Sequence, residues 1–393
     1  MAQQGLDTGK KGEQFDTGGV LAISAGHFVH DVYSSFLPPL LPLLIAKLSM
    51  SLTAASMLAT AMQLPSLGNP WLGAWLERRG LQHLLVFAPG ATAVAMCLLG
   101  LAPGYAWVVL LLVLAGVSVA LWHVPAPVAV GELSGNQVGR GMGFFMTGGE
   151  LARAVGPMVA VGSVAWLGLE GYYPVMAGGL AASAWLWLRL RRRALPAGRR
   201  AGATPGSAWR EVRHVMLPLT AVLVARAFMH AAMSTFLPTF LEQETGNLWL
   251  AGAGLTLLEA FGVVGVFTAG AASDRWGRKE VIRVSILGAP LGILLFVCCG
   301  GWIRVIALAL VGFLLLSSMP AMLAMVQEHA PNHRAAANGY FIMISSLTRS
   351  LVVIPVGMIG DTFGLEAAYV AGAAVGLLAW PFLARLPDTP SRA

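Results

Sequence analysis

The chain alternates long apolar stretches with short polar breaks. Each stretch has roughly 20 to 30 residues, enough for an α-helix to cross a bilayer with its backbone hydrogen bonds satisfied internally. The pattern predicts an all-α membrane protein with twelve transmembrane helices, at residues 17–46, 51–76, 81–101, 105–131, 139–168, 170–191, 213–242, 247–272, 278–298, 302–328, 335–361 and 365–387.

One polar gap, residues 192–212, is much longer than the others and carries several arginines around Pro and Gly. Such composition is typical of a linker. We therefore expect two six-helix bundles, at 17–191 and 213–387, joined by this cytoplasmic linker and flanked by cytoplasmic tails at 1–16 and 388–393. The first tail has no apolar segment, so we expect no cleavable signal peptide.

Composition agrees with a lipid environment, because 57% of the residues are hydrophobic and 11% are charged, whereas soluble domains carry about 25% charged residues. Of the 25 Lys and Arg residues, only Lys47 and Arg304 fall on the side opposite the termini, and Arg153, Arg226 and Arg349 fall inside helices. The positive-inside rule then predicts cytoplasmic termini in a bacterial inner membrane. It also explains the net charge of +7 without a nucleic-acid partner.

The two halves of the chain resemble each other. His30 and Ser35-Phe36-Leu37-Pro38 match His230 and Thr235-Phe236-Leu237-Pro238, and Glu132, Gly143-Phe144-Phe145 and Arg153 match Glu328, Gly339-Tyr340-Phe341 and Arg349. Parallel repeats of this kind predict two similar bundles around an axis along the membrane normal, with a binding site between them near mid-depth.

These motifs resemble the major facilitator superfamily. The family's loop motif is nearly complete at Gly270, Asp274, Arg275, Gly277, Arg278 and Lys279, and a degraded copy, with Glu in place of Asp, lies at Gly73, Glu77, Arg78, Arg79 and Gly80. The resemblance implies that both loops latch the halves in one conformation. A segment similar to the antiporter motif of helix five ends in Gly-Pro and contains Gly148, Gly149, Gly156 and Pro157, which we interpret as close helix packing.

Within that superfamily the chain is most similar to the fosmidomycin-resistance-type exporters. The resemblance rests on His27 and Asp31, on Trp122-His123-Val124-Pro125, and on Gln327, Glu328 and Pro331. It implies alternating-access transport, by a proton-coupled antiporter that exports a small organic anion or an amphiphilic drug-like compound. Import or exchange of a carboxylate, phosphonate or phosphate ester is the alternative.

Charged residues near the middles of helices are the strongest candidates for a site. Each costs roughly 2.5 to 3.5 kcal/mol there, so they are expected to face one another or a wet cavity. The set is Asp31, Glu150, Arg153, Arg226, Glu259 and Arg349. Because Arg153 and Arg349 occupy equivalent positions of the repeat, they should face one cavity, with Arg226 approaching from a third direction. A guanidinium group can form two parallel hydrogen bonds to a carboxylate or phosphate, so these arginines suggest an anion site. Internal pairing, of Arg153 with Glu150 and of Arg226 with Asp31 or Glu259, is the alternative.

Other polar and aromatic side chains complete the expected site. We assign His230, Trp122 and His123 to substrate binding, although each could instead be a packed interior side chain. Asp31 is the first candidate for proton coupling, with His27 one turn away, and Glu150 and Glu259 follow. A fixed structural ion pair is the alternative for Asp31.

No catalytic constellation, nucleotide-binding loop or clustered metal ligands can be recognised from linear spacing. We therefore expect neither an enzyme nor a cofactor or metal, and a receptor or membrane enzyme on this fold is a minor alternative. The expected partners are the anionic or amphiphilic substrate, protons and the lipid bilayer. We expect the protein to function as a monomer.

Overall fold

The computed structural model describes residues 15–69, 82–135, 137–191, 205–330 and 334–388, and these form helices without strands. The first half of the chain contains α1 (Thr17–Ser34), α2 (Leu37–Leu48), α3 (Leu52–Gln63), η1 (Leu64–Gly68), η2 (Gln82–Phe87), α5 (Ala88–Cys97), η3 (Leu99–Leu101), α6 (Tyr105–His123), α7 (Pro125–Leu133), α8 (Val138–Leu167), η4 (Tyr173–Val175) and α9 (Met176–Leu190).

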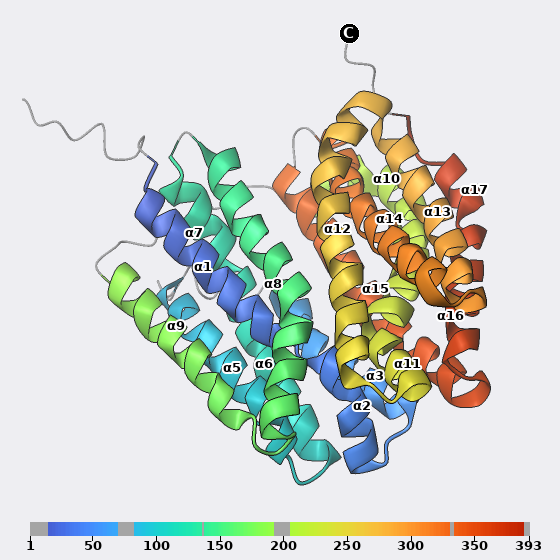
Figure 1. Cartoon of the computed structure of the whole chain (residues 1–393). Helices are drawn as coiled ribbons and strands as arrows, with labels where there is room; N and C mark the ends of the chain where they lie inside the picture. The colour runs from blue at the N-terminus through green and yellow to red at the C-terminus, as the bar shows by residue number, and fades with distance from the viewer. Residues whose placement is uncertain (1–14, 70–81, 136, 192–204, 331–333, 389–393) are drawn as a thin grey trace, which may run out of the picture.

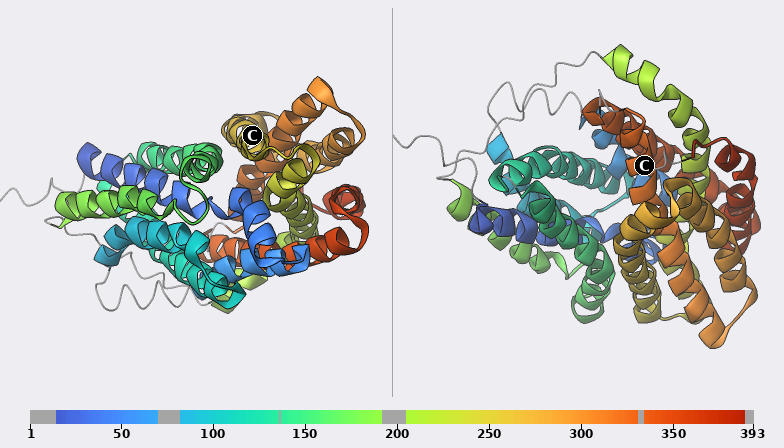
Figure 2. Two further views of the ribbon diagram at one scale, coloured as in Figure 1. Left: turned by 60° about the horizontal axis from the view of Figure 1, so that its bottom comes forward. Right: turned by 90° about the horizontal axis from the view of Figure 1, so that it is seen from above.

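The second half contains α10 (Pro205–His230), the π-helical turn η5 (Ala231–Thr235), α11 (Phe236–Thr245), α12 (Leu248–Trp276), α13 (Arg278–Cys298), α14 (Gly301–Glu328), α15 (Arg334–Phe363), α16 (Leu365–Leu378) and α17 (Trp380–Ala384). Figure 1 shows the halves side by side, and Figure 2 shows the same division from two further directions. The helix α10 begins at Pro205, inside the segment that the sequence predicts as linker.

Within the described residues, nine helices are long and apolar enough to cross a membrane. The remaining predicted spans correspond to α3 with η1, to α8 and to α9. The predicted span of α3 and η1 extends beyond residue 69, where the described part of the chain is interrupted. The helix α8 carries charged residues, and α9 has only 15 residues. Together with the nine apolar helices, these three account for the twelve helices that the sequence predicts.

Large apolar side chains on the outer surface indicate that lipid is the solvent. Trp166 is 86% exposed, Trp302 is 81% exposed and Phe363 is 74% exposed. Soluble monomers rarely expose many side chains of this kind, whereas a bilayer accommodates them. The chain is thus a multi-pass membrane protein.

The first helix of each half is interrupted at the same repeat position. In the first half, α1 ends at Ser34 and α2 begins at Leu37, just before Pro38. In the second half, the turn η5 lies between α10 and α11, just before Pro238. Proline removes a backbone donor and clashes with the preceding turn, so both helices deviate there. The repeat seen in the sequence is therefore a repeat of structure.

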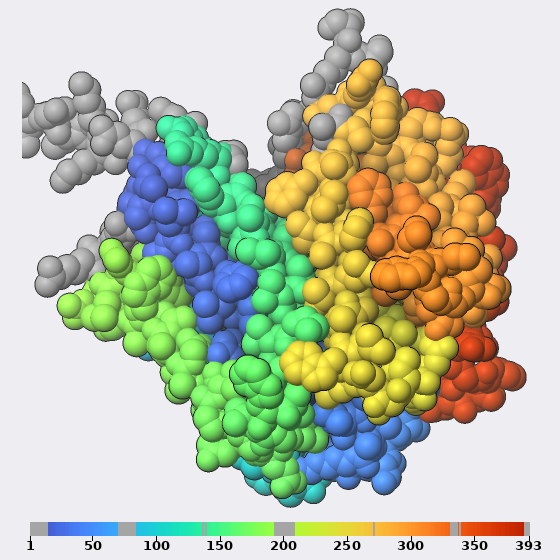
Figure 3. All heavy atoms as spheres, viewed as in Figure 1, coloured from blue at the N-terminus to red at the C-terminus, as the bar shows by residue number. Residues whose placement is uncertain are grey.

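The halves touch along α8 and α12, along α3 and α15, and at α2 and α11. The α2–α11 contact lies at the end of the molecule opposite the start of α1 and the C-terminus, which we call the far side (Figure 1). There Asp361, near the end of α15, accepts hydrogen bonds from the backbone N–H groups of Leu52 (2.6 Å) and Thr53 (2.8 Å), at the start of α3. Figure 3 shows the halves in contact in its lower part and a notch between them at the top, on the side of the termini.

Candidate functional site

A cavity of about 510 Å³ lies between the two halves. Its walls come from α1, α2, α3, α6 and α8 on one side and from α10, α12 and α15 on the other. The titratable members of the lining are His123, Arg153, His230, Glu259 and Arg349, and serine, threonine, glutamine and asparagine side chains also contribute. Sequence-predicted residues from five helices thus meet around one space.

Arg153 on α8 lies between two carboxylates. It forms an ion pair with Glu150, one turn earlier on the same helix, and its Nε lies 3.9 Å from Oε2 of Glu259 on α12. The contact with Glu259 joins the two halves of the molecule. The pairing of Arg153 with Glu150, which the sequence analysis kept as an alternative, is therefore the arrangement found.

Arg349 on α15 lines the same cavity and is exposed. Among the residues that the structure describes, no hydrogen bond or ion pair to its guanidinium is found. Arg153 and Arg349, which occupy equivalent repeat positions, thus reach one cavity from opposite halves. Only one of them has a carboxylate partner.

Arg226 on α10 is buried, with 5% of its surface exposed. Its Nε donates to the carbonyl of Leu315 (3.1 Å) and to Oγ of Ser318 (3.0 Å), both on α14. Within the described part of the chain it forms no ion pair, so the suggested pairs with Asp31 and Glu259 are wrong. The rotation of α10 directs this side chain at the uncharged residues of α14. His230, one turn further, lines the cavity, and its Nδ1 lies 3.0 Å from Oγ of Ser234.

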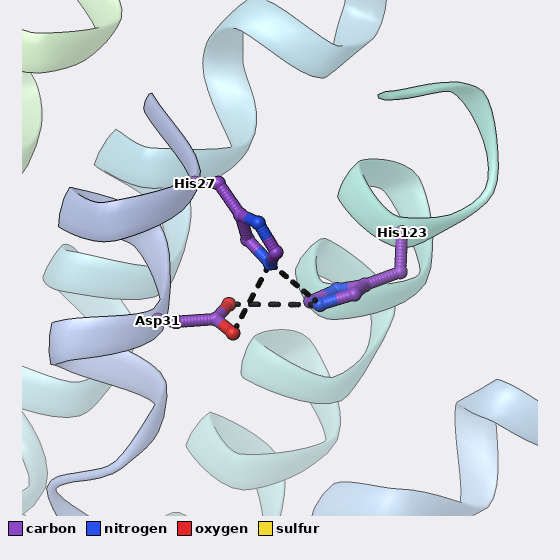
Figure 4. A group of neighbouring side chains, drawn as sticks. All are labelled: His27, Asp31 and His123. Atoms are coloured by element: carbon purple, nitrogen blue, oxygen red, sulfur yellow. Dashed lines mark hydrogen bonds and ion pairs between the residues drawn. The ribbon is translucent and has the colours of Figure 1, made fainter. Parts of the chain in front are cut away.

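Asp31 lies among histidines and not beside an arginine. Its carboxylate is 2.8 Å from Nδ1 of His30, 3.3 Å from Nε2 of His27 and 3.6 Å from Nε2 of His123. Figure 4 shows His27 and Asp31 on α1 pointing toward His123 at the end of α6. Asp31 and His27 are buried, whereas His123 reaches the cavity.

This cluster corrects the expectation that the chain lacks clustered metal ligands. His27, Asp31 and His123 each offer a ligand atom, and these atoms lie within 4.8 Å of one another. The spacing of His27 and Asp31 on one helix face was visible in the sequence. His123 is remote in sequence, and only the packing of α6 against α1 brings it to the other two.

Trp122 does not line the cavity, contrary to its assignment to substrate binding. Its side chain is fully buried, its ring stacks on His30 with centroids 5.5 Å apart, and it also lies close to Leu186 around Gly26. Successive helical residues point about 100° apart, and here His123 faces the cavity while Trp122 points into the packed interior. Trp122 therefore acts as a packing residue beside the histidine cluster.

The glycines of α8 allow close contact with α1. A Cβ at Gly148 would lie 2.5 Å from the carbonyl oxygen of Ser24, and one at Gly149 would lie 2.5 Å from Cε1 of His27. A Cβ at Gly156 would lie closer still to Ser35. Small residues at this interface let the two helices approach as the sequence interpretation expects. Pro157, the next residue, lines the cavity.

The loop motif of the second half forms a charged junction. Arg278 contacts Asp274 (2.6 Å) and Glu328 (3.0 Å), and so joins the start of α13 to the ends of α12 and α14. Gly277 between the helices has a φ of 94°, which favours glycine. Gly270 lies within α12, and Arg275 is exposed. The first-half copy, at Gly73, Glu77 and Arg78, lies outside the described residues.

Relatives of known sequence match nearly the whole chain. It is 26% identical to the fosmidomycin resistance protein of Escherichia coli (strain K12) over 369 residues, covering 91% of this chain and 90% of that protein. It is 24% identical over 378 residues to the uncharacterized MFS-type transporter YfnC of Bacillus subtilis (strain 168), covering 92% and 91% of the two chains.

Solved structures share the fold. A mutant of the nucleoside transporter NupG superimposes with a TM-score of 0.77 at 16% identity, over 94% of this chain and all of that one. A bacterial homologue of the human lysosomal transporter Spinster, in an inward-facing and occupied conformation, gives a TM-score of 0.76 at 16% identity, over 93% and 95% of the two chains. The family model described as Major Facilitator Superfamily matches residues 23–352, with a further match over 248–393. Because this match covers most of the sequence and the fold agrees with it, the chain belongs to the major facilitator superfamily of membrane transporters.

Proposed function

We propose that the protein is a secondary active transporter that exports a small organic anion in exchange for protons. The observation that carries the anionic character of the substrate is Arg349, which is exposed in the cavity without a hydrogen-bond or ion-pair partner among the described residues. A cation held at mid-depth in a membrane is costly unless it is compensated. A carboxylate, phosphonate or phosphate group on the substrate would supply the missing counter-charge.

The charges around the cavity support the same substrate class. Glu150 and Glu259 both lie beside Arg153, whereas Arg226 and Arg349 have no carboxylate within ion-pair distance in the part of the chain that the structure describes. The third carboxylate of this set, Asp31, lies among histidines, so it compensates neither of these two arginines. Two guanidinium groups without a carboxylate partner among the described residues favour an anionic ligand over a cationic one.

The remaining lining suggests that the substrate also has an apolar part. Leu37, Met62 and Val353 contribute to the walls, and the cavity volume of about 510 Å³ lies within the range of pockets that hold drug-sized ligands. Met is adaptable and favours varied apolar partners. A small amphiphilic anion therefore fits this lining better than an inorganic ion.

Two observations support export. The Escherichia coli relative is named for resistance to a drug, and the Gly156–Pro157 segment resembles the antiporter motif. If the termini lie in the cytoplasm of a bacterial cell, as the charge distribution predicts, the notch between the halves opens inward, where an exported compound would enter.

The position of Glu259 favours a second function, uptake of the anion together with a proton. Glu259 lies near Arg153 and competes with any substrate carboxylate for that guanidinium. A proton on Glu259 would neutralise one of the two carboxylates beside Arg153, and a substrate anion could then take its place, so proton and anion would bind together. The same cavity would then serve an importer, the alternative that the sequence left open.

Anion binding can be tested with purified protein and a panel of carboxylates and phosphonates, followed by thermal shift and calorimetry. One hydrogen-bonded charge contributes about 1.5 to 3 kcal/mol, so we expect Arg349→Ala to bind a hit roughly 10- to 150-fold more weakly. Arg349→Lys should recover only part of the affinity, because Lys cannot form a bidentate pair. Arg283→Ala is the matched control, since Arg283 is paired with Glu280 on the outer surface of α13. Undiminished binding by Arg349→Ala would refute the anion site.

Coupling can be tested in proteoliposomes loaded with the best ligand of that panel. Export by antiport predicts that an imposed proton gradient drives the anion in the direction opposite to the proton flow. Uptake together with a proton predicts that the anion moves in the same direction as the protons. In the uptake mechanism, Glu259→Gln should remove the response to the gradient. Transport that ignores gradients of both signs would contradict proton coupling in either form.

A further inference from the structure

We propose that His27, Asp31 and His123 form a binding site for a divalent transition-metal ion of the zinc class. The three side chains converge at the wall of the cavity (Figure 4). The proposal goes beyond the transport of an organic anion and does not depend on the identity of that anion.

The hydrogen bonds of the two imidazoles fix which nitrogens can bind a metal. Nδ1 of His27 lies 2.8 Å from the carbonyl oxygen of Phe145, and Nδ1 of His123 lies 3.1 Å from that of Val119. A carbonyl can only accept, so both Nδ1 atoms carry a hydrogen. In the neutral rings the lone pairs are then on Nε2. Backbone carbonyls commonly orient metal-binding histidines in this way.

The two Nε2 atoms face each other at 3.4 Å. Two lone pairs cannot bond to each other, and the Asp31 carboxylate beside them adds only further acceptors. The arrangement therefore requires a positive centre among the three groups. A single shared proton would satisfy the same atoms, so it is the alternative that an experiment must exclude.

The distances fit a tetrahedral metal site. Zinc bonds of about 2.0 to 2.2 Å place ligand atoms about 3.3 to 3.6 Å apart at tetrahedral angles and about 2.8 to 3.1 Å apart at octahedral angles. Here Nε2 of His27 lies 3.4 Å from Nε2 of His123 and 3.3 Å from Oδ2 of Asp31, and Nε2 of His123 lies 3.6 Å from Oδ1 of Asp31. The distance between the two Nε2 atoms falls in the tetrahedral range, and each Nε2 lies at such a distance from a different oxygen of Asp31. With one ligand atom from each residue, the three atoms lie within 4.8 Å of one another, so a bound ion would draw one carboxylate oxygen toward both imidazoles.

The surroundings hold the ligands and leave one side open. His30 contacts the Asp31 carboxylate at 2.8 Å, and the ring of His27 stacks on Phe145 with centroids 4.0 Å apart. The side chains of His27 and Asp31 are 5% exposed, whereas that of His123 is 37% exposed and lines the cavity. A fourth ligand, water or a transported anion, would approach from the cavity. Two imidazoles, one carboxylate and an open position are the donor set of many zinc sites.

The test uses full-length protein purified in detergent, stripped with a chelator and titrated with Zn²⁺ by calorimetry. We expect one site in the wild type and at least a 100-fold loss of affinity in His123→Ala and in Asp31→Asn. His329→Ala is the matched control, because His329 contacts His214 in the second half but belongs to no three-ligand cluster among the described residues. Thermal unfolding without metal checks that each variant is folded.

A second measurement needs no variant. Co²⁺ bound to the wild type should show the intense visible absorption of tetrahedral coordination, and Zn²⁺ should displace it. If wild type and His123→Ala bind Zn²⁺ equally, or if Co²⁺ gives only the weak spectrum of the hydrated ion, the cluster holds no metal and the proposal is refuted. Because these titrations contain no organic anion, and anion binding can be measured in the presence of chelator, either proposal can fail without the other.

Discussion

The contact of Asp361 with the start of α3 should help to keep the far side closed. Asp361 lies near the end of α15 in the second half, whereas Leu52 and Thr53 open α3 in the first half. The carboxylate accepts from both backbone N–H groups and from the Thr53 hydroxyl. When the halves separate on this side, as alternating access requires, these bonds must break.

The free energy that Asp361 contributes to the closed state can be taken from similar contacts at helix N-termini. The N-cap of α3 is Ser51, and the Asp361 carboxylate accepts from two further N–H groups of the first turn. Replacing a side chain that caps such groups with Ala costs about 0.5 to 2 kcal/mol. The helix dipole adds about 0.3 to 1 kcal/mol for a negative charge at an N-terminus. Because Asp361 is exposed and water can replace its partners, we take about 2 kcal/mol for the sum, which corresponds to roughly a 30-fold change in an equilibrium constant.

We therefore expect Asp361→Ala to shift the population from the closed toward the open far side by about 30-fold. Spin labels at Tyr173 and Glu366, in a background without the native cysteines, would report the separation of the halves by pulsed electron paramagnetic resonance. The control is Thr362→Ala, because within the part of the chain that the structure describes the Thr362 hydroxyl donates only to the carbonyl of Met358 on its own helix. If Asp361→Ala gives the same distance distribution as this control, the contact does not stabilise the closed state.

Two further predictions concern stability. Gly149→Ala should lower the free energy of unfolding by about 1 to 3 kcal/mol, and with it the thermal unfolding midpoint in detergent, because the new Cβ would lie 2.5 Å from the His27 ring. Gly143→Ala should leave the midpoint unchanged, because a Cβ there meets nothing within 4 Å. Glu170, which the sequence places at the start of a span, lies in the turn between α8 and η4, outside the membrane-spanning helices, and the hydrogen bond from Lys47 lowers the pKa of its carboxyl from 4.5. A carboxyl group whose pKa is lower in the folded than in the unfolded protein stabilises the fold at pH values above its unfolded-state pKa. This stabilisation is lost as the pH falls through the folded-state pKa. Glu170→Gln should therefore unfold at a lower temperature than wild type at neutral pH, and a difference that persists in strong acid would contradict this.

Local features of the sequence determined the class of fold. Long apolar stretches require helices in lipid, because an unsatisfied backbone group is too costly there, and this constraint does not depend on how the helices pack. The repeat of Ser35–Pro38 in Thr235–Pro238 likewise located the interruptions of both first helices, since proline acts on its own turn. Small residues at Gly148 and Gly149 indicated a tight helix contact without naming its partner.

Apart from the pair of Arg153 with Glu150 on the same helix, the partners of the charged side chains were decided by tertiary structure. The cost of a charge at mid-depth showed that each arginine needs a compensating group or a wet cavity. The rotation of each helix decided that Arg153 also meets Glu259, that Arg226 meets Ser318 and that Arg349 lines the cavity. The same holds for Trp122 and His123, neighbours in sequence that point to a packed interior and to the cavity. Hydropathy fixes how deep a residue lies, whereas its contacts depend on helices far apart in the chain.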